Sequence, residues 1–161
     1  MVLTLFNDEY GCGNCGRRFR VPSFSEFSYG EFLLRSEGTT EQLYLQGLDN
    51  SVFDELGDFT DHNPRLAKID ANTRADLFQE AFGELAIDPN DQGAHWSLGR
   101  FPTCPDCGEA KWGWRREINE AITVELAEPT YSLWNGYATN EKKLRVDQFL
   151  KRKGYRRFLV F

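Results

Sequence analysis

The chain has 161 residues, of which 40% are hydrophobic and 27% charged, and it carries a formal net charge of −6. Its length is that of one ordinary domain, and its composition lies outside the disordered range. The longest apolar run, residues 158–161, is too short for a transmembrane helix. The N-terminal residues lack a basic start and soon turn acidic, so they predict no secretory signal. We therefore expect one cytoplasmic domain over residues 1–161, without membrane contact.

Short strands are predicted beside the two cysteine pairs of the chain and near its C-terminus. In chain order they lie at residues 2–6, 17–21, 31–35, 42–45, 111–117, 122–126 and 156–161. Pro22 is expected to end the second strand, because proline lacks the N–H group that a sheet requires.

Two capping boxes predict where helices begin. Ser51-Val-Phe-Asp54 precedes Gly57, a residue type that commonly ends helices, so a short helix is expected at residues 52–56. Thr73-Arg-Ala-Asp76 begins the clearest helix, whose apolar residues fall on one face. A further helix is expected at residues 141–153. Two to three helices with several antiparallel hairpins predict an α+β fold.

Four cysteines form two C-x-x-C pairs, and a glycine follows each pair. The segments are Cys12-Gly-Asn-Cys15-Gly16 and Cys104-Pro-Asp-Cys107-Gly108. The two-residue spacer lets both sulfurs of a pair reach one ion, and four thiolates form a closed tetrahedral zinc site. The glycines tolerate the positive φ of a tight turn around the sulfurs. The pattern predicts one structural Zn²⁺ bound by Cys12, Cys15, Cys104 and Cys107.

Both segments resemble the knuckles of zinc-ribbon and rubredoxin-like folds, over residues 8–21 and 101–116. The resemblance implies that each knuckle is the tip of a β-hairpin and that the two grip one Zn²⁺. It names no family for the rest of the chain. The pairs lie 88 residues apart, whereas compact ribbons use roughly 15–20. We therefore expect the ion to tie an N-terminal hairpin to a later one, rather than to enclose a large insertion.

Three alternatives to a zinc site are open. Disulfides are disfavoured because cytosolic thiols stay reduced. A redox-active pair would follow a strand and begin a helix, a context that neither pair has. Iron accepts the same ligands, so the cysteines alone do not separate the two metals. A site with four thiolates has no open position for water, which predicts stability rather than catalysis.

The charge is divided along the chain. Residues 21–110 carry −12, whereas residues 141–161 carry +6. Basic and aromatic residues also alternate beside the cysteines, at Arg17, Arg18, Arg20, Lys111, Trp112, Trp114, Arg115 and Arg116. Cations that meet phosphates and rings that stack on bases would form a nucleic-acid surface. The other interpretation is that Trp112 and Trp114 share a strand face and belong to the core, and an acidic isoelectric point also disfavours nucleic acid.

The acidic middle of the chain offers a second surface, with Asp54, Glu55, Asp58 and Asp61. One interpretation is an ordinary solvated face. The other is a surface for a basic partner protein, because complementary charge speeds encounter and selects partners. Small acidic inhibitors and immunity proteins bind basic partners in this way, which is an analogy of charge and size.

Catalytic motifs are not found in the sequence. It has no His-Glu-x-x-His, no P-loop and no nucleophile elbow. An enzyme that uses His62 and nearby carboxylates is a third hypothesis, and His95 has no assigned role. The sequence favours a non-enzymatic, zinc-stabilised module that binds a basic protein through its acidic middle. The alternative is a nucleic-acid-associated zinc ribbon that uses the residues beside the cysteines and the basic C-terminus.

Overall fold

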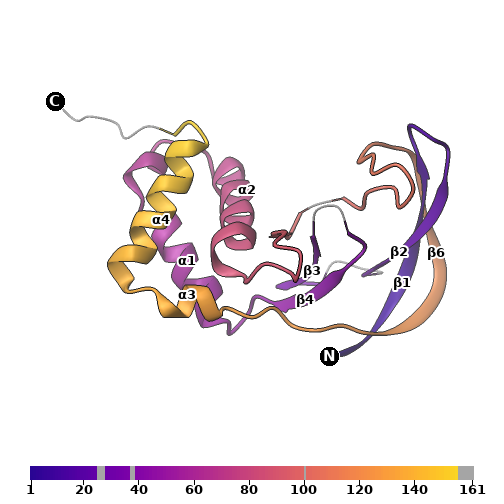
Figure 1. Cartoon of the computed structure of the whole chain (residues 1–161), viewed down its shortest axis with the longest axis horizontal. Coiled ribbons are helices and arrows are strands. Elements are labelled where there is room, and N and C mark those ends of the chain that lie inside the picture. Colours follow the sequence, from indigo (N-terminus) through magenta and orange to yellow (C-terminus); the bar gives the residue numbers. More distant parts are fainter. Residues whose placement is uncertain (25–27, 37–38, 100, 156–161) are drawn as a thin grey trace.

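The computed structural model describes residues 1–24, 28–36, 39–99 and 101–155. A curved sheet forms one end of the molecule, a group of helices forms the other, and a second small sheet lies between them (Figure 1). The predicted α+β fold is confirmed. Within the described residues, no helix is long and apolar enough to cross a bilayer.

The curved sheet consists of β1 (Val2–Cys12), β2 (Arg18–Ser23) and β6 (Trp112–Glu125), in the antiparallel order β2-β1-β6. β1 runs on from the predicted residues 2–6 to the first cysteine. β6 is one strand where two were predicted, because pairing with β1 continues across a bulge. The partners change from Phe6 with Ala121 to Asn7 with Ile118, so residues 119 and 120 are extra.

Pro22 does not end β2, which continues to Ser23. The N–H of Cys12 donates to the carbonyl of Arg17 at 2.8 Å. Backbone groups alternate in direction along an antiparallel strand, so the nitrogen of Pro22 points away from β1. Proline is tolerated there because no ladder bond is lost on that side of an edge strand.

The second sheet contains β3 (Glu31–Ser36), β4 (Gln42–Gln46) and β5 (Trp96–Ser97), in the order β4-β3-β5. The first two strands agree with the prediction to within one residue. β5 has only two residues, too few for a periodic pattern, and was not predicted. The chain after β6 lies against β4, because the N–H of Tyr44 donates to the carbonyl of Ala127 at 2.9 Å.

Helix α1 (Ser51–Asp61) is about twice as long as predicted. Its cap is Asn50, one residue before the predicted box, and the Asn50 side chain accepts from the N–H groups of Val52 and Phe53 at 3.1 Å. Gly57 lies inside the helix rather than at its end. Interior glycine costs roughly 1 kcal/mol, which the burial of Leu56 and Thr60 on either side offsets.

The next helices also begin at a side-chain cap. After a 3₁₀ turn at Pro64–Leu66, α2 (Ala71–Ala81) is capped by Asp70, which accepts from the N–H of Thr73 at 2.9 Å. Thr73 therefore lies in the first turn and is not the cap. A π turn, Phe82–Ala86, continues α2, and the helix ends before Pro89 as predicted.

Two helices follow β6. The short α3 (Ser132–Gly136) was not predicted, whereas α4 (Thr139–Arg152) was expected at residues 141–153. Gly154 ends α4 with a φ of +93°. The strand predicted at residues 156–161 lies outside the described residues.

One hydrophobic core joins the helices to the small sheet. Its fully buried side chains come from β3, α1, the π turn, α3 and α4, and include Leu34, Leu56, Phe82, Trp134 and Phe149. The helices between the two cysteine pairs thus share their core with helices that follow the second pair. The intervening residues are not a self-contained insertion.

Candidate metal centre

The first cysteine pair lies in the turn between β1 and β2. Cys12 is the last residue of β1, and its N–H bond to Arg17 closes the turn at 2.8 Å. Gly16 has a φ of +73°, which glycine adopts without strain, and its N–H donates to the carbonyl of Cys12 at 3.2 Å. These bonds direct Cys12 and Cys15 toward one point.

The second cysteine pair repeats this geometry ahead of β6. The N–H of Cys104 donates to the carbonyl of Glu109, and the N–H of Gly108 to the carbonyl of Cys104, both at 2.9 Å. Gly108 also has a φ of +73°. The two turns are therefore equivalent knuckles. The second is not the tip of a hairpin, however, because residues 101–103 form no strand.

Pairing of β1 with β6 brings the two knuckles together across 88 residues of sequence. The N–H of Gly13 donates to the carbonyl of Lys111 at 2.9 Å. An added Cβ on Gly13 would lie 2.9 Å from the same oxygen, so this close approach requires glycine. A backbone contact thus fixes one knuckle against the strand that follows the other.

The four sulfurs form one compact cluster. The Sγ–Sγ distance is 3.5 Å between Cys12 and Cys107 and 3.6 Å between Cys15 and Cys104, and all four atoms lie within 4.8 Å of one another. Sulfurs that surround one ion tetrahedrally at about 2.3 Å are about 3.8 Å apart, whereas a disulfide needs about 2.05 Å. The cluster has the size of a four-thiolate metal site, and its cysteines are free.

The pKa values of the two cysteines of the first knuckle are shifted in opposite directions, by backbone N–H groups and by the crowding of sulfurs. The N–H groups of Cys15 and Asn14 point at the Cys12 sulfur and lower its pKa to about 6. The N–H of Arg17 lowers the pKa of Cys15, but burial and the neighbouring thiols raise it more, to about 12. Four sulfurs this close do not all ionise at neutral pH without a cation among them, and a divalent metal ion supplies that charge.

Each knuckle supplies one buried and one exposed cysteine. Cys12 and Cys104 are 7% and 2% exposed, whereas Cys15 and Cys107 face solvent. Across the part of the chain that the structure describes, these four cysteines are the one group of ligand side chains with metal-binding spacing. The donor set fits Zn²⁺ and iron alike.

Trp112 and Trp114 do not share a face of β6, which corrects the expectation from their spacing. Their partners in β1 are the neighbouring residues Cys12 and Gly11, because one extra residue of β6 lies between the two tryptophans. Both indoles are exposed, by 42% and 38%, so neither belongs to the core. The aromatic surface beside the cysteines is therefore divided between the two faces of the sheet.

Trp114 lies between two arginines. The guanidinium groups of Arg18 and Arg116 lie over its ring, 5.6 and 6.0 Å from the ring centroid. The indole also covers Gly11, where an added Cβ would lie 2.2 Å from Nε1. These contacts hold the ring flat against the sheet.

Two buried acids in β1 bind the arginines of the neighbouring strands. Arg115 pairs with Asp8 at 2.8 Å, and Glu9 pairs with Arg20 at 3.3 Å and with Arg116 at 2.7 Å. Burial raises the pKa of Glu9, but the bonds from the two arginines lower it more, so the net direction is downward. The interpretation of the sequence overlooked both acids. An acidic pair inside a strand, between two arginine-rich segments, is the signal that identifies them.

The other cations beside the cysteines differ in whether they have an ion-pair partner. Arg17 pairs with Asp106 at 3.3 Å. Among the described residues, Arg18 and Lys111 have no ion-pair partner, and the C-terminal cations Arg156 and Arg157 lie outside the described residues. Most of the positive charge predicted beside the cysteines is thus neutralised within the protein.

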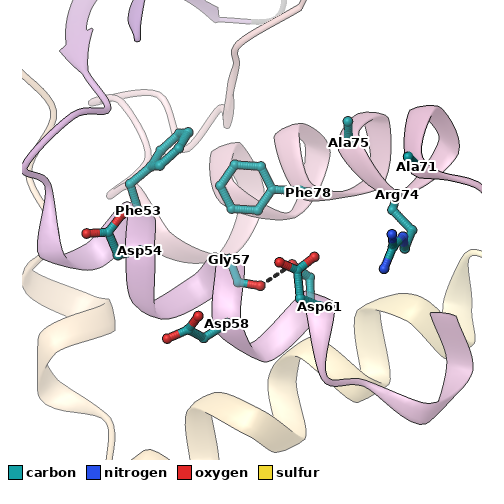
Figure 2. A pocket seen from close by; sticks show the side chains of 10 residues that line it. Phe53, Asp54, Gly57, Asp58, Asp61, Ala71, Arg74, Ala75 and Phe78 are labelled. Atoms are coloured by element: carbon teal, nitrogen blue, oxygen red, sulfur yellow. Dashed lines mark hydrogen bonds between the residues drawn. The ribbon is translucent and has the colours of Figure 1, made fainter. Parts of the chain in front are cut away.

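The acidic residues of the middle segment divide into two groups. Asp54, Asp58 and Asp61 line a groove of about 440 Å³ between α1 and α2, into which the rings of Phe53 and Phe78 also project (Figure 2). Glu55 does not line this groove. Three of the four predicted acids are thus brought together on one surface.

Glu55 binds side chains of α3 and α4 at the helical end of the molecule. Its carboxylate accepts from Nζ of Lys142 at 2.9 Å and from Nε1 of Trp134 at 2.9 Å. Trp134 is fully buried and the side chain of Lys142 is 11% exposed. Glu55 therefore connects α1 to α3 and α4 and does not face the groove.

The two histidines lie apart from the cysteines. His62 follows α1, where its Nδ1 is 2.9 Å from the carbonyl oxygen of Asp58. His95 lines a separate groove together with Glu80 and Glu84. Neither histidine lies in the metal-binding cluster.

Comparison of the chain with known proteins gives no match among family models, curated proteins or solved structures. The assignment of a metal-binding function therefore rests on the geometry of the four sulfurs, and the likeness to zinc-ribbon knuckles extends to that cluster.

Proposed function

We propose that the four cysteines hold one structural Zn²⁺ and that the protein is a non-enzymatic module that binds a basic partner protein. The observation that carries the proposal is the sulfur cluster, in which two equivalent knuckles from distant segments meet at tetrahedral spacing. A closed set of four thiolates stabilises a fold and leaves no position for substrate. The free energy of binding such an ion is free energy of folding.

The metal proposal is tested by metal analysis and by Cys104→Ser. We expect one zinc per chain, lost in the variant, and a melting temperature that falls strongly in the variant and on addition of a chelator to the native protein. The chelator should have no further effect on Cys104→Ser, which serves as its control. If the native protein purifies with iron, the metal of the site is iron and not zinc. An unchanged melting temperature in the variant would contradict the structural role.

The groove between α1 and α2 supports binding of a basic partner. Its three carboxylates can accept from a lysine or arginine, while the rings of Phe53 and Phe78 cover the aliphatic part of such a side chain. Arg74 lies on the α2 side of the groove and leaves the carboxylates in excess (Figure 2). Complementary charge of this kind raises the association rate and loses strength with salt.

The partner proposal is tested with the natural host lysate and a triple variant, Asp54→Asn, Asp58→Asn and Asp61→Asn. We expect the native protein to capture a basic polypeptide whose affinity falls as salt rises, and the triple variant to lose it. A matched control replaces three exposed acids outside the groove, with Asp76→Asn, Asp91→Asn and Glu128→Gln. Equal capture by the triple variant would exclude the groove.

A second candidate function is the binding of single-stranded nucleic acid beside the metal centre. The observation that favours it is the exposure of Trp112, Trp114 and Phe101. Arg18 and Lys111, which have no ion-pair partner among the described residues, belong to the same segments of the chain. Exposed rings stack on bases and cations bind phosphates. Affinity for an oligonucleotide should then fall linearly with salt on a log–log scale and weaken in Trp112→Ala. No affinity at low salt would contradict it.

A further inference from the structure

The outer edge of β6 is an open strand edge. β6 has 14 residues, and most of them are exposed on both faces of the sheet. It pairs with β1 on one side, and no described strand pairs with it on the other. Such an edge presents a row of N–H and C=O groups that another strand can join.

We propose that the outer edge of β6 binds β6 of a second copy of this chain, antiparallel, with Ile118 of both copies at the two-fold axis. The two curved sheets then become one, in the order β2-β1-β6-β6-β1-β2. The proposal is independent of the groove between α1 and α2 and of the partner assigned to it.

The charges along β6 favour an antiparallel copy. Residues 111–116 carry +3 and residues 117–125 carry −3. An antiparallel copy places the basic half of one strand beside the acidic half of the other, whereas a parallel copy places like charges together. With Ile118 opposite Ile118, Arg116 faces Glu120 of the second copy, and the symmetry repeats this pair. Within its own chain Arg116 also pairs with Glu9 at 2.7 Å, and Glu120 pairs with Arg20 at 3.9 Å.

The faces of the paired residues agree with this register. Trp114, Ile118 and Ile122 pair with alternate residues of β1, at positions 11, 7 and 5, so their side chains share one face. The register sets Trp114 opposite Ile122 of the second copy. Aromatic residues opposite β-branched ones are among the favourable cross-strand pairs.

The directions of the backbone groups of β6 also agree with this register. Leu126 exchanges two bonds with Met1, so even-numbered residues of β6 direct their backbone groups to β1 and Ala121 directs its own outward. The two extra residues of the bulge preserve this alternation, so Arg115 also points outward. The register places Arg115 opposite Ala121, where the two can exchange hydrogen bonds.

Charge-reversed variants test the pairing in the zinc-loaded full chain. We expect a dimer of the native protein by sedimentation equilibrium, and dissociation constants about tenfold higher or more for Glu120→Arg and for Arg116→Glu. Because Arg116 also pairs with the buried Glu9, the melting temperature of each variant is measured first to show that the monomer folds. Each single variant sets like charges opposite each other, but a mixture of the two restores both opposite-charge pairs. The mixture should therefore form a heterodimer near native affinity. Glu128→Arg, an equal charge change beyond β6, is the control.

A second variant addresses the backbone directly. In Ala121→Pro the missing N–H points away from β1, as it does at Pro22 of β2, so the monomer should fold while pairing is lost. A native protein that stays monomeric at all concentrations would overturn the proposal. So would charge-reversed variants that dimerise as the native protein does, or a monomer that captures a strand of another protein through the same edge.

Discussion

Two neighbouring acids of α1 should respond very differently to substitution. Glu55→Ala would leave the buried ammonium of Lys142 and the Nε1 of Trp134 without their common acceptor. Loss of one partner from a largely buried pair leaves an uncompensated charge, so we expect a cost of about 2–4 kcal/mol. Asp58→Ala, on the groove side of the same helix, should change stability by less than about 0.5 kcal/mol. Urea unfolding of both variants measures the difference.

Asp88 connects the end of α2 to the start of α3. Its carboxylate accepts from the N–H of Ser132 at 2.8 Å, from the N–H of Leu133 at 2.9 Å and from the hydroxyl of Thr130 at 2.7 Å. Burial raises the pKa of Asp88, but the bond from Leu133 and the bonds from Thr130 and Ser132 lower it more. Its carboxylate form therefore stabilises the folded state.

Asp88→Asn should thus have a pH-dependent cost. Because the folded pKa is lowered, the contribution of Asp88 is present above its unfolded pKa of about 3.9 and is lost as pH falls through the folded value. We expect a deficit of about 1 kcal/mol at neutral pH, which shrinks below about pH 4. Unfolding free energies of both proteins over a pH series test this, and a constant deficit would contradict it.

At the scale of the element, two helical glycines have opposite roles. An added Cβ on Gly57 in α1 would meet only Phe78, at 3.8 Å, whereas on Gly83 in the π turn it would lie 1.9 Å from the carbonyl oxygen of Trp96. Gly57→Ala should therefore stabilise the protein by up to about 1 kcal/mol. Gly83→Ala should destabilise it by about 2 kcal/mol or more, because the backbone of the π turn and that of Trp96 must move apart. Melting temperatures that shift in the same direction would contradict this contrast.

Strand and helix positions could largely be predicted from the sequence, because β-branched and apolar periodicity is a local signal. The ends were harder to predict. Asn50 and Asp70 cap the helices that Ser51 and Thr73 were expected to begin, since any of these side chains can accept the same bonds. α3 was missed because the carboxylate that accepts from its first N–H groups, that of Asp88, lies 44 residues away from Ser132. A bond over that distance leaves no pattern in the local sequence.

The grouping of the four cysteines could be predicted from the sequence, since the two C-x-x-C-G segments carry their own turn geometry. The surfaces around it could not. Whether a cation is free or neutralised depends on strand pairing, which sets Asp8 and Glu9 of β1 between Arg20 and Arg115. The direction of Glu55 depends likewise on a lysine 87 residues further along the chain.

For the whole molecule, the metal site and the helical core lie at opposite ends (Figure 1). We expect metal removal to loosen the curved sheet before the helices, because the core among the helices contains none of the four cysteines. Amide hydrogen exchange after chelation should lose protection first at residues 8–21 and 104–117. The amides of α1 and α4 should stay protected. Simultaneous loss of amide protection at both ends would show instead that the molecule unfolds as one unit.

The pairing of β1 with β6 also has a consequence for the order of events during synthesis. A ribosome produces the first knuckle and its hairpin before the strand that completes the sheet, which follows only at residues 112–125. Until then the first pair of cysteines lacks the second pair, and one edge of β1 has no strand to pair with. Contacts this distant in sequence form slowly. We therefore expect the newly made hairpin of β1 and β2 to need protection by chaperones until β6 emerges and completes both the sheet and the set of four cysteines.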